Sequence, residues 1–126
     1  SNASAYQFQT AQKDGKPLYQ AVMEEMMEIS TPDNMMFVVG ATKADKLQEL
    51  RSFCPDNFFL VPGVGAQGGS LSEVCKYGMT DECCLLVNSS RAIIYADNTE
   101  NFAQAAAEAA KAVQIEMAAE LDNRGI

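Results

Sequence analysis

The chain has 126 residues, enough for one domain of ordinary size, and 48% of them are hydrophobic, enough for a buried core. Nine Lys and Arg residues oppose seventeen Asp and Glu residues, and the resulting net charge of −8 disfavours nucleic acid or a basic membrane patch as a partner. No apolar segment approaches the roughly 20 residues of a membrane span, and we recognise no signal peptide. We therefore expect no contact with a membrane.

The cysteine content gives little support to metal or nucleophile chemistry. The four cysteines are Cys54, Cys75, Cys83 and Cys84, none forms a Cys-x-x-Cys pair, and the chain has no histidine. A structural zinc site is therefore not expected, and a Ser-His or Cys-His nucleophile pair is excluded. We interpret the cysteines as small apolar residues with reduced thiols in a cytoplasmic protein.

The N-terminal part predicts a loop and then a helix. We interpret residues 1–3 as a tag remnant and assign residues 4–126 to the domain. Residues 4–16 show no sustained period and predict a loop, whereas Pro17 suits the first turn of a helix that stops before Thr31-Pro32. The apolar stripe expected for this helix comprises Leu18, Val22, Met26 and Ile29, widened by Met23 and Met27.

Three strand-then-helix units follow. The expected strands are Met35–Gly40, Phe58–Gly63 and Cys83–Asn88, and the first reads as a strand buried on both faces. The expected helices run from Thr42 to about Phe53, from near Leu71 to just before Gly78, as a short segment within 89–96, and over about 100–121.

Local signals mark the ends of these helices. Thr42 with Asp45 resembles a capping box, and Ser70-x-x-Glu73 is one. Gly78 is expected at the position just past a helix end. The last helix is predicted to start from Thr99 or Asn98, and its inner face to comprise Ala105, Ala109, Val113 and Met117. In the helix after Thr42, Leu47 and Leu50 are expected to face inward.

This order favours right-handed βα units with parallel strands. Three parallel strands are few for a complete sheet of this kind, which usually continues into an open doubly wound sheet or an eight-stranded barrel. The sequence therefore predicts a fragment.

Candidate binding residues follow the strands, because function gathers at the carboxyl ends of strands in βα proteins. The three ends are Gly40–Thr42, Pro62–Gly69 and Asn88–Arg91. The second end is rich in glycine, and backbone N–H groups there, followed at once by a helix start, favour an anion. The alternative is a turn that only permits tight packing.

Arg91, next to Ser89 and Ser90, adds a cation at the third end. An arginine can bind phosphate with two hydrogen bonds, although a solvent-facing salt bridge is the alternative. Together the second and third ends predict a phosphate site.

The segments "VVGATKADKLQELRSFCPDNFFLVPGVGAQGG" and "LLVNSSRAIIYA" resemble the C-terminal half of the orotidine 5′-phosphate decarboxylase family, in its bacterial subfamily. The resemblance covers about Phe8 to Met117. It implies part of an eight-stranded (βα)8 TIM barrel, with strands six to eight present. It also implies conversion of orotidine monophosphate to UMP in pyrimidine synthesis, without cofactor or metal.

The resemblance also assigns roles to single residues. Gln67 resembles the glutamine that spans phosphate and pyrimidine, Arg91 the arginine that binds phosphate, and 62–69 the loop that closes over phosphate. The substrate-binding residues implied in this way are Pro62, Gly63, Gly65, Ala66, Gln67, Gly68, Gly69, Ser90 and Arg91.

The family's catalytic D-x-K-x-x-D motif is missing, since Asp14-Gly15-Lys16 matches only its first half. We therefore expect no catalytic residue in this chain, and no activity from the chain alone. The alternative is a non-catalytic phosphate-binding or interaction module derived from a barrel that binds a ribulose phosphate. Open strands further predict self-association, or pairing with an N-terminal half-barrel.

Overall fold

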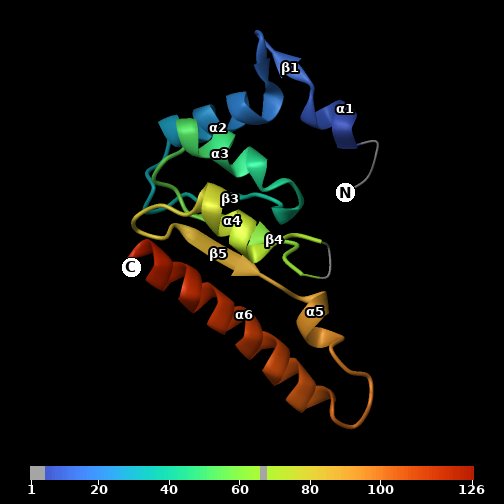
Figure 1. The fold of residues 1–126 in the computed structure, drawn as a ribbon. Helices are drawn as coiled ribbons and strands as arrows, with labels where there is room; N and C mark the ends of the chain where they lie inside the picture. Colours follow the sequence, from blue (N-terminus) through green and yellow to red (C-terminus); the bar gives the residue numbers. More distant parts are fainter. Residues whose placement is uncertain (1–4, 66–67) are drawn as a thin grey trace.

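A three-stranded parallel sheet forms the centre of the chain. The computed structural model describes residues 5–65 and 68–126. Strands β3 (Phe37–Val38), β4 (Phe59–Pro62) and β5 (Leu85–Asn88) lie in the order β3-β4-β5, and both pairs are parallel (Figure 1). The parallel arrangement predicted from the order of the elements is confirmed.

Helices connect the strands of this sheet and pack beside it. The remaining elements are α1 (Ala5–Gln9), β1 (Gln12–Lys13), β2 (Lys16–Pro17), α2 (Leu18–Glu28), η1 (Ala41–Lys43), α3 (Asp45–Phe53), α4 (Leu71–Gly78), α5 (Arg91–Ile94) and α6 (Phe102–Arg124). In the part of the chain described by the structure, none of these helices is both long and apolar enough to cross a membrane.

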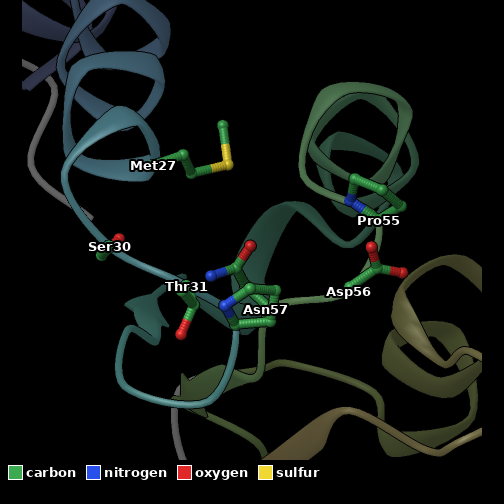
Figure 2. Close-up of a pocket in the computed structure, with 7 residues that line it drawn as sticks. Met27, Ser30, Thr31, Pro55, Asp56 and Asn57 are labelled. Atoms are coloured by element: carbon green, nitrogen blue, oxygen red, sulfur yellow. The ribbon is translucent and has the colours of Figure 1, made fainter.

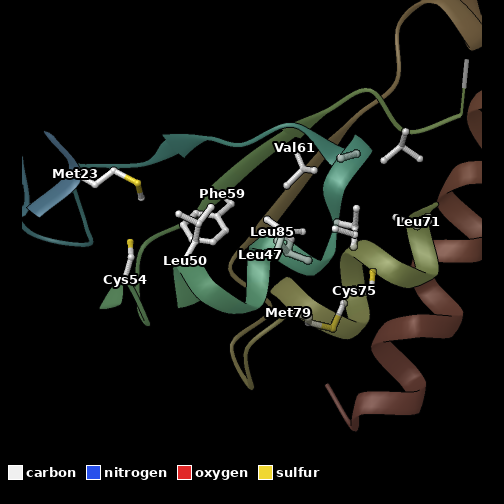
Figure 3. Close-up of a cluster of buried hydrophobic side chains, with 14 residues drawn as sticks. Met23, Leu47, Leu50, Cys54, Phe59, Val61, Leu71, Cys75, Met79 and Leu85 are labelled. Atoms are coloured by element: carbon white, nitrogen blue, oxygen red, sulfur yellow. The ribbon is translucent and has the colours of Figure 1, made fainter. Parts of the chain in front are cut away.

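One face of the sheet carries the hydrophobic core. Phe59 and Val61 of β4 are fully buried, and residues at a period of two share this face, as a strand requires. Helices α3 and α4 supply the opposing side chains, and Figure 3 shows them converging on β4. The largest contributions from these two helices come from Leu47, Leu50, Leu71, Val74 and Cys75.

The other face of the sheet is largely uncovered. Val38 aligns with Leu60, and Leu60 with Leu86, so one apolar row crosses all three strands. The outer members of the row, Val38 and Leu86, are 68% and 48% exposed. The prediction that the first strand is buried on both faces is therefore wrong, because no described helix packs over this row.

The predicted loop over residues 4–16 is also wrong. This segment contains α1 and a small antiparallel hairpin in which Lys13 aligns with Lys16. Asp14 and Gly15 form the two-residue connection with φ of 54° and 82°. Asp-Gly with two positive φ angles is a favoured hairpin turn. This dipeptide, rather than any hydrophobic period, was the sequence signal for the hairpin.

Helix α2 forms where it was predicted, but only part of the predicted stripe faces inward, namely Met23 and Met27. Met23 is buried, and Tyr19 and Met27 pack against the core. Leu18, Val22 and Ile29 of the predicted stripe are exposed. The apolar residues of α2 thus cover more than one face, and periodicity alone could not say which face meets α3.

Two of the predicted helix ends need correction. Helix α3 follows the 3-10 turn η1 and has no side-chain cap, so the Thr42–Asp45 capping box is wrong. Gly78 lies inside α4 rather than just past its end. A Cβ built at this position would lie 3.2 Å from a side-chain atom of Leu47 and 3.3 Å from one of Leu85. Close packing therefore explains this glycine.

Helix α6 starts after Asn101 rather than after Thr99 or Asn98, and it ends at Gly125 with φ of 87°. Its inner face is the predicted one, since Val113 and Met117 pack against the core. The thiol of Cys75 lies 3.7 Å from the sulfur of Met117, which fixes α6 beside α4.

The chain enters β5 through an unusual backbone turn. Cys83 and Cys84 have φ of 66° and 49°, although neither is glycine. Thr80 and Cys83 exchange two backbone hydrogen bonds of 3.1 Å, so this turn begins directly after α4. All four cysteines are free thiols.

Candidate functional site

The structure brings the ends of β4 and β5 together. The Ser89 hydroxyl donates a hydrogen bond of 3.3 Å to the carbonyl of Val64. A side chain built on Gly65 would lie 3.4 Å from the Cβ of Ala92, the second residue of α5. The loop after β4 and the start of α5 therefore share one small space at the carboxyl edge of the sheet.

The glycines of the loop after β4 satisfy conformational and steric demands. Gly63, Gly65 and Gly68 have φ of 96°, 80° and 86°, in the region that other residues rarely adopt. Gly69 is different, because a Cβ there would lie 2.6 Å from the Cβ of Ala41 and 2.8 Å from the carbonyl oxygen of Gly63. The loop thus folds back tightly over the first residue of η1.

Hydrogen bonds inside the loop use several amides that the sequence assigned to an anion. Gly65 N–H donates to the Gly69 carbonyl at 3.0 Å, and Gly68 N–H donates to the Gly65 carbonyl at 2.7 Å. Gly69 N–H donates to the Gly63 carbonyl at 3.2 Å. Donors for an anion at this edge are therefore better sought at the start of α4, where the first amides of a helix lack intrahelical acceptors.

Helix α4 begins immediately after this loop. The Ser70 hydroxyl accepts a hydrogen bond of 3.3 Å from the N–H of Glu73, so the predicted cap of this helix is confirmed. Leu71 and Val74 are buried, which anchors the first turn against the core. The helix start is consequently held in a fixed place beside the loop.

Two predicted residues, Ala66 and Gln67, lie outside the described residues. The assignment of Gln67 to phosphate and pyrimidine stays a prediction. The flanking residues Gly65 and Gly68 are described, and they are joined by the hydrogen bond given above.

Arg91 is the first residue of α5 and is exposed. Its side chain has no ion pair with any other residue that the structure describes. The amide of Asn88 donates a 3.3 Å hydrogen bond to the hydroxyl of Ser90, which orders the turn just before Arg91. The alternative of a surface salt bridge thus receives no support within the described residues.

Sequence reasoning overlooked the part played by the first strand end. Ala41 is 2% exposed and lies beneath Gly69, so this end supports the glycine loop through packing. Ser89, which was not among the predicted site residues, bonds directly to the loop. A small residue directly after each strand was the available signal for both.

A surface pocket, shown in Figure 2, is formed by segments that precede β3 and β4, so it lies at the opposite edge of the sheet. Asn57 is buried there and fully engaged: its amide donates to the Met35 carbonyl at 2.9 Å and accepts from the Cys54 thiol at 3.3 Å. The carboxylate of Asp56 on the wall disfavours phosphate. The pocket is lined by Met27, Ser30, Thr31, Pro32, Pro55, Asp56 and Asn57. It contains none of the predicted site residues.

The described residues offer no cluster of Cys, Asp and Glu side chains that could hold a metal ion. Burial raises the pKa of the Cys54 thiol, and it raises the pKa of Cys75 to about 12. Both thiols therefore remain protonated at neutral pH and are poor nucleophiles.

The chain has the features of part of a βα barrel: parallel strands, helices on one face, and a glycine-rich loop at the carboxyl edge. No protein-family model matches the chain. It is 55% identical over 122 residues to an orotidine 5′-phosphate decarboxylase of Christiangramia forsetii, covering 97% of this chain and 45% of that protein. It is 54% identical over 127 residues to the enzyme of the same name from Parabacteroides distasonis, again 45% of that protein.

Solved structures agree with the sequence matches. The structure of Leishmania donovani UMP synthase superposes with a TM-score of 0.69 at 33% identity, over 88% of this chain and 25% of that one. Leishmania donovani OMP decarboxylase gives 0.68 at 29% identity, over 90% and 44%. The chain is therefore related to the orotidine 5′-phosphate decarboxylases and has the fold of a partial TIM barrel, as the sequence predicted. It spans about 45% of the length of the curated relatives that it matches.

Proposed function

We propose that residues 4–126 are the C-terminal half of an orotidine 5′-phosphate decarboxylase domain, which supplies the loops that bind the phosphate and the pyrimidine. The observation that carries the proposal is the 55% identity over 97% of the chain to a decarboxylase of that name. The adjacency of the glycine loop and Arg91 supports it, because phosphate sites in such barrels lie between the loops of the last two strands. A cytoplasmic location belongs to the same proposal.

Within the whole enzyme, this half would provide binding energy rather than proton transfer. Contacts of Arg91, Gln67 and the start of α4 with the nucleotide lie away from the reacting carbon. Such remote binding energy can be used to position and destabilise the reacting group. The reaction releases CO2 from orotidine monophosphate, leaves a carbanion at the ring and ends with its protonation to UMP. Preorganised charges that stabilise this carbanion would come from the other half.

Turnover tests the first part of the proposal. The sequence lacks the D-x-K-x-x-D motif, so we expect no decarboxylation of orotidine monophosphate by this chain alone. The loss of ultraviolet absorbance of the substrate measures the reaction. Activity above the background of a matched, separately purified Arg91→Ala sample would contradict the proposal.

Ligand preference tests the second part. Titration calorimetry with UMP and with ribose 5-phosphate should show a preference for UMP, and Arg91→Ala should weaken both. Equal binding of the two ligands would favour a general phosphate-binding module instead. Arg124→Ala is a matched control, because it removes the same charge from an exposed ion pair with Asp81.

Pairing with an N-terminal half-barrel is the third part. Strands β3 and β5 each pair only with β4 among the described residues, and the row Val38, Leu60 and Leu86 lies open beside them. Apolar surface and unpaired strand edges favour association. Co-expression with a segment that carries D-x-K-x-x-D should yield a complex that turns over orotidine monophosphate. In its absence we expect self-association in analytical ultracentrifugation, and a strict monomer at high concentration would contradict this.

A further inference from the structure

The side chain of Arg51, in α3, is surrounded by backbone carbonyls. Its Nε donates to the carbonyl of Gly78 at 2.7 Å, and its Nη2 donates to the carbonyl of Cys84 at 2.8 Å. Its Nη1 donates to the backbone carbonyl of Asn57 at 2.6 Å and, at longer distances of 3.2 Å and 3.3 Å, to the backbone carbonyls of Cys54 and Pro55. One guanidinium therefore contacts five backbone carbonyls and uses all three of its nitrogens.

The guanidinium also lies over an aromatic ring. Its central carbon is 3.7 Å from the ring centre of Phe59, which is fully buried. An arginine stacked on an aromatic face gains attraction from the ring quadrupole. The Cys84 carbonyl accepts two hydrogen bonds, one from Nη2 of Arg51 and one from the backbone amide of Phe59. This shared acceptor links Arg51 to the pairing of β4 with β5.

Helix termini supply negative charge to this half-buried cation. No carboxylate among the described residues forms an ion pair with Arg51. The Cys54 carbonyl lies at the C-terminal end of α3, and the Gly78 carbonyl ends α4. Helix C-termini carry a partial negative charge, so two of them converge on this cation.

We infer that these carbonyls form a built site for a guanidinium ion, which the chain fills with the side chain of Arg51. In the occupied state the site fixes the starts of β4 and β5 against the ends of α3 and α4. When the side chain is removed, the five carbonyls and the face of Phe59 remain as a receptor for free guanidinium. This inference does not depend on the proposed function, because the site lies at the opposite edge of the sheet from Gly63–Gly69 and Arg91.

Chemical rescue tests the inference. Arg51→Ala should lower the ratio of folded to unfolded chain by at least about 100-fold, since several charge-assisted hydrogen bonds disappear and buried carbonyls lose their donors. Guanidinium chloride at low millimolar concentration should raise the melting midpoint of this variant but not that of the wild type. Sodium chloride at the same ionic strength should do neither. A variant as stable as wild type, or one that responds equally to both salts, overturns the inference.

Two further measurements keep the test decisive. Arg51→Lys retains the charge but not the planar fork, so it should lose stability as well, and full stability would overturn the inference. Arg124→Ala is the control for charge removal and should melt close to wild type.

If Arg51→Ala does not fold at all, the wild-type chain decides. The Nε–H of Arg51 should exchange with solvent at least about tenfold more slowly than that of exposed Arg91, because it is engaged with the Gly78 carbonyl. Equal exchange rates for the two arginines would overturn the inference.

Discussion

The two edges of the parallel sheet use the same residue type for different purposes. At the edge where the strands begin, Arg51 is held by five carbonyls and an aromatic ring. At the edge where they end, Arg91 is exposed and has no ion pair with a described residue. The difference indicates that the first edge stabilises the fold, whereas the second carries the proposed ligand site.

The backbone shows the same contrast. Close to Arg51, carbonyls point inward and are satisfied by the guanidinium, so this edge has little freedom to change. The loop after β4 instead depends on glycines with positive φ at Gly63, Gly65 and Gly68, where the chain approaches α5 closely. In βα barrels, stability and function are commonly divided between the two edges in this way.

The largest effect should come from the stabilising edge. Phe59→Ala removes a fully buried ring from beneath Arg51 and should lower the free energy of unfolding by about 3–5 kcal/mol. Urea denaturation followed by circular dichroism measures the loss. Phe102→Ala, at the exposed first residue of α6, is the matched control. Similar losses of unfolding free energy in the two variants would contradict the stabilising role of the edge that contains Phe59.

The ligand edge should respond in binding rather than in stability. Arg91→Ala should reduce affinity for UMP by roughly 10-fold to 100-fold, because a charge-assisted hydrogen bond is lost. The free energy of unfolding should stay within about 0.5 kcal/mol of wild type. Calorimetry and urea denaturation on one preparation measure both quantities, and a large stability loss would show that Arg91 also supports the fold.

Gly69 tests whether packing shapes the ligand edge. Gly69→Ala places a methyl group 2.6 Å from the Cβ of Ala41, so the loop must shift, at a cost of about 1–3 kcal/mol. Gly40→Ala is the control, because its Cβ would meet nothing within 4 Å and its φ of −67° suits alanine. Urea denaturation compares the two variants, and equal stability would contradict the close approach.

The smallest effect concerns acid, at a contact between α2 and α3. Hydrogen bonds from Lys46 and Tyr19 hold the pKa of Glu49 below its ordinary 4.5. A lowered folded-state pKa stabilises the chain above the unfolded-state pKa, and this contribution is lost as pH falls through the folded-state pKa. Glu49→Gln should therefore melt slightly below wild type at pH 7, and the two curves should converge in acid. Glu100→Gln is the control for the removal of an exposed carboxylate.

Much of the fold could be predicted from sequence because its signals are local. Continuous apolar runs located β4 and β5, and Ser70 with Glu73 located the start of α4. Failures occurred where packing chose between local possibilities. The apolar residues of α2 cover more than one face, and tertiary packing buries Met23 while Val22 stays exposed.

The candidate site was only partly predictable. Strand ends and glycines indicated that the loop after β4 and the start of α5 lie at one edge, since this depends on chain order alone. The use of three glycine amides within their own loop, and the contact of Gly69 with Ala41, depend on tertiary geometry. Two of the five carbonyls around Arg51 belong to Gly78 and Cys84, 27 and 33 positions away, and no local pattern could reveal these contacts.

The turn into β5 restricts which substitutions the chain can accept. Cys83 and Cys84 both have left-handed backbone conformations, and each costs a residue with a Cβ about 1–2 kcal/mol. Tolerance at these positions should therefore follow backbone preference rather than thiol chemistry. Glycine or asparagine at position 83 should be accepted more readily than valine or isoleucine, although a strand, where valine and isoleucine are usually favoured, begins at Leu85. A library of variants scored for folding would show this order.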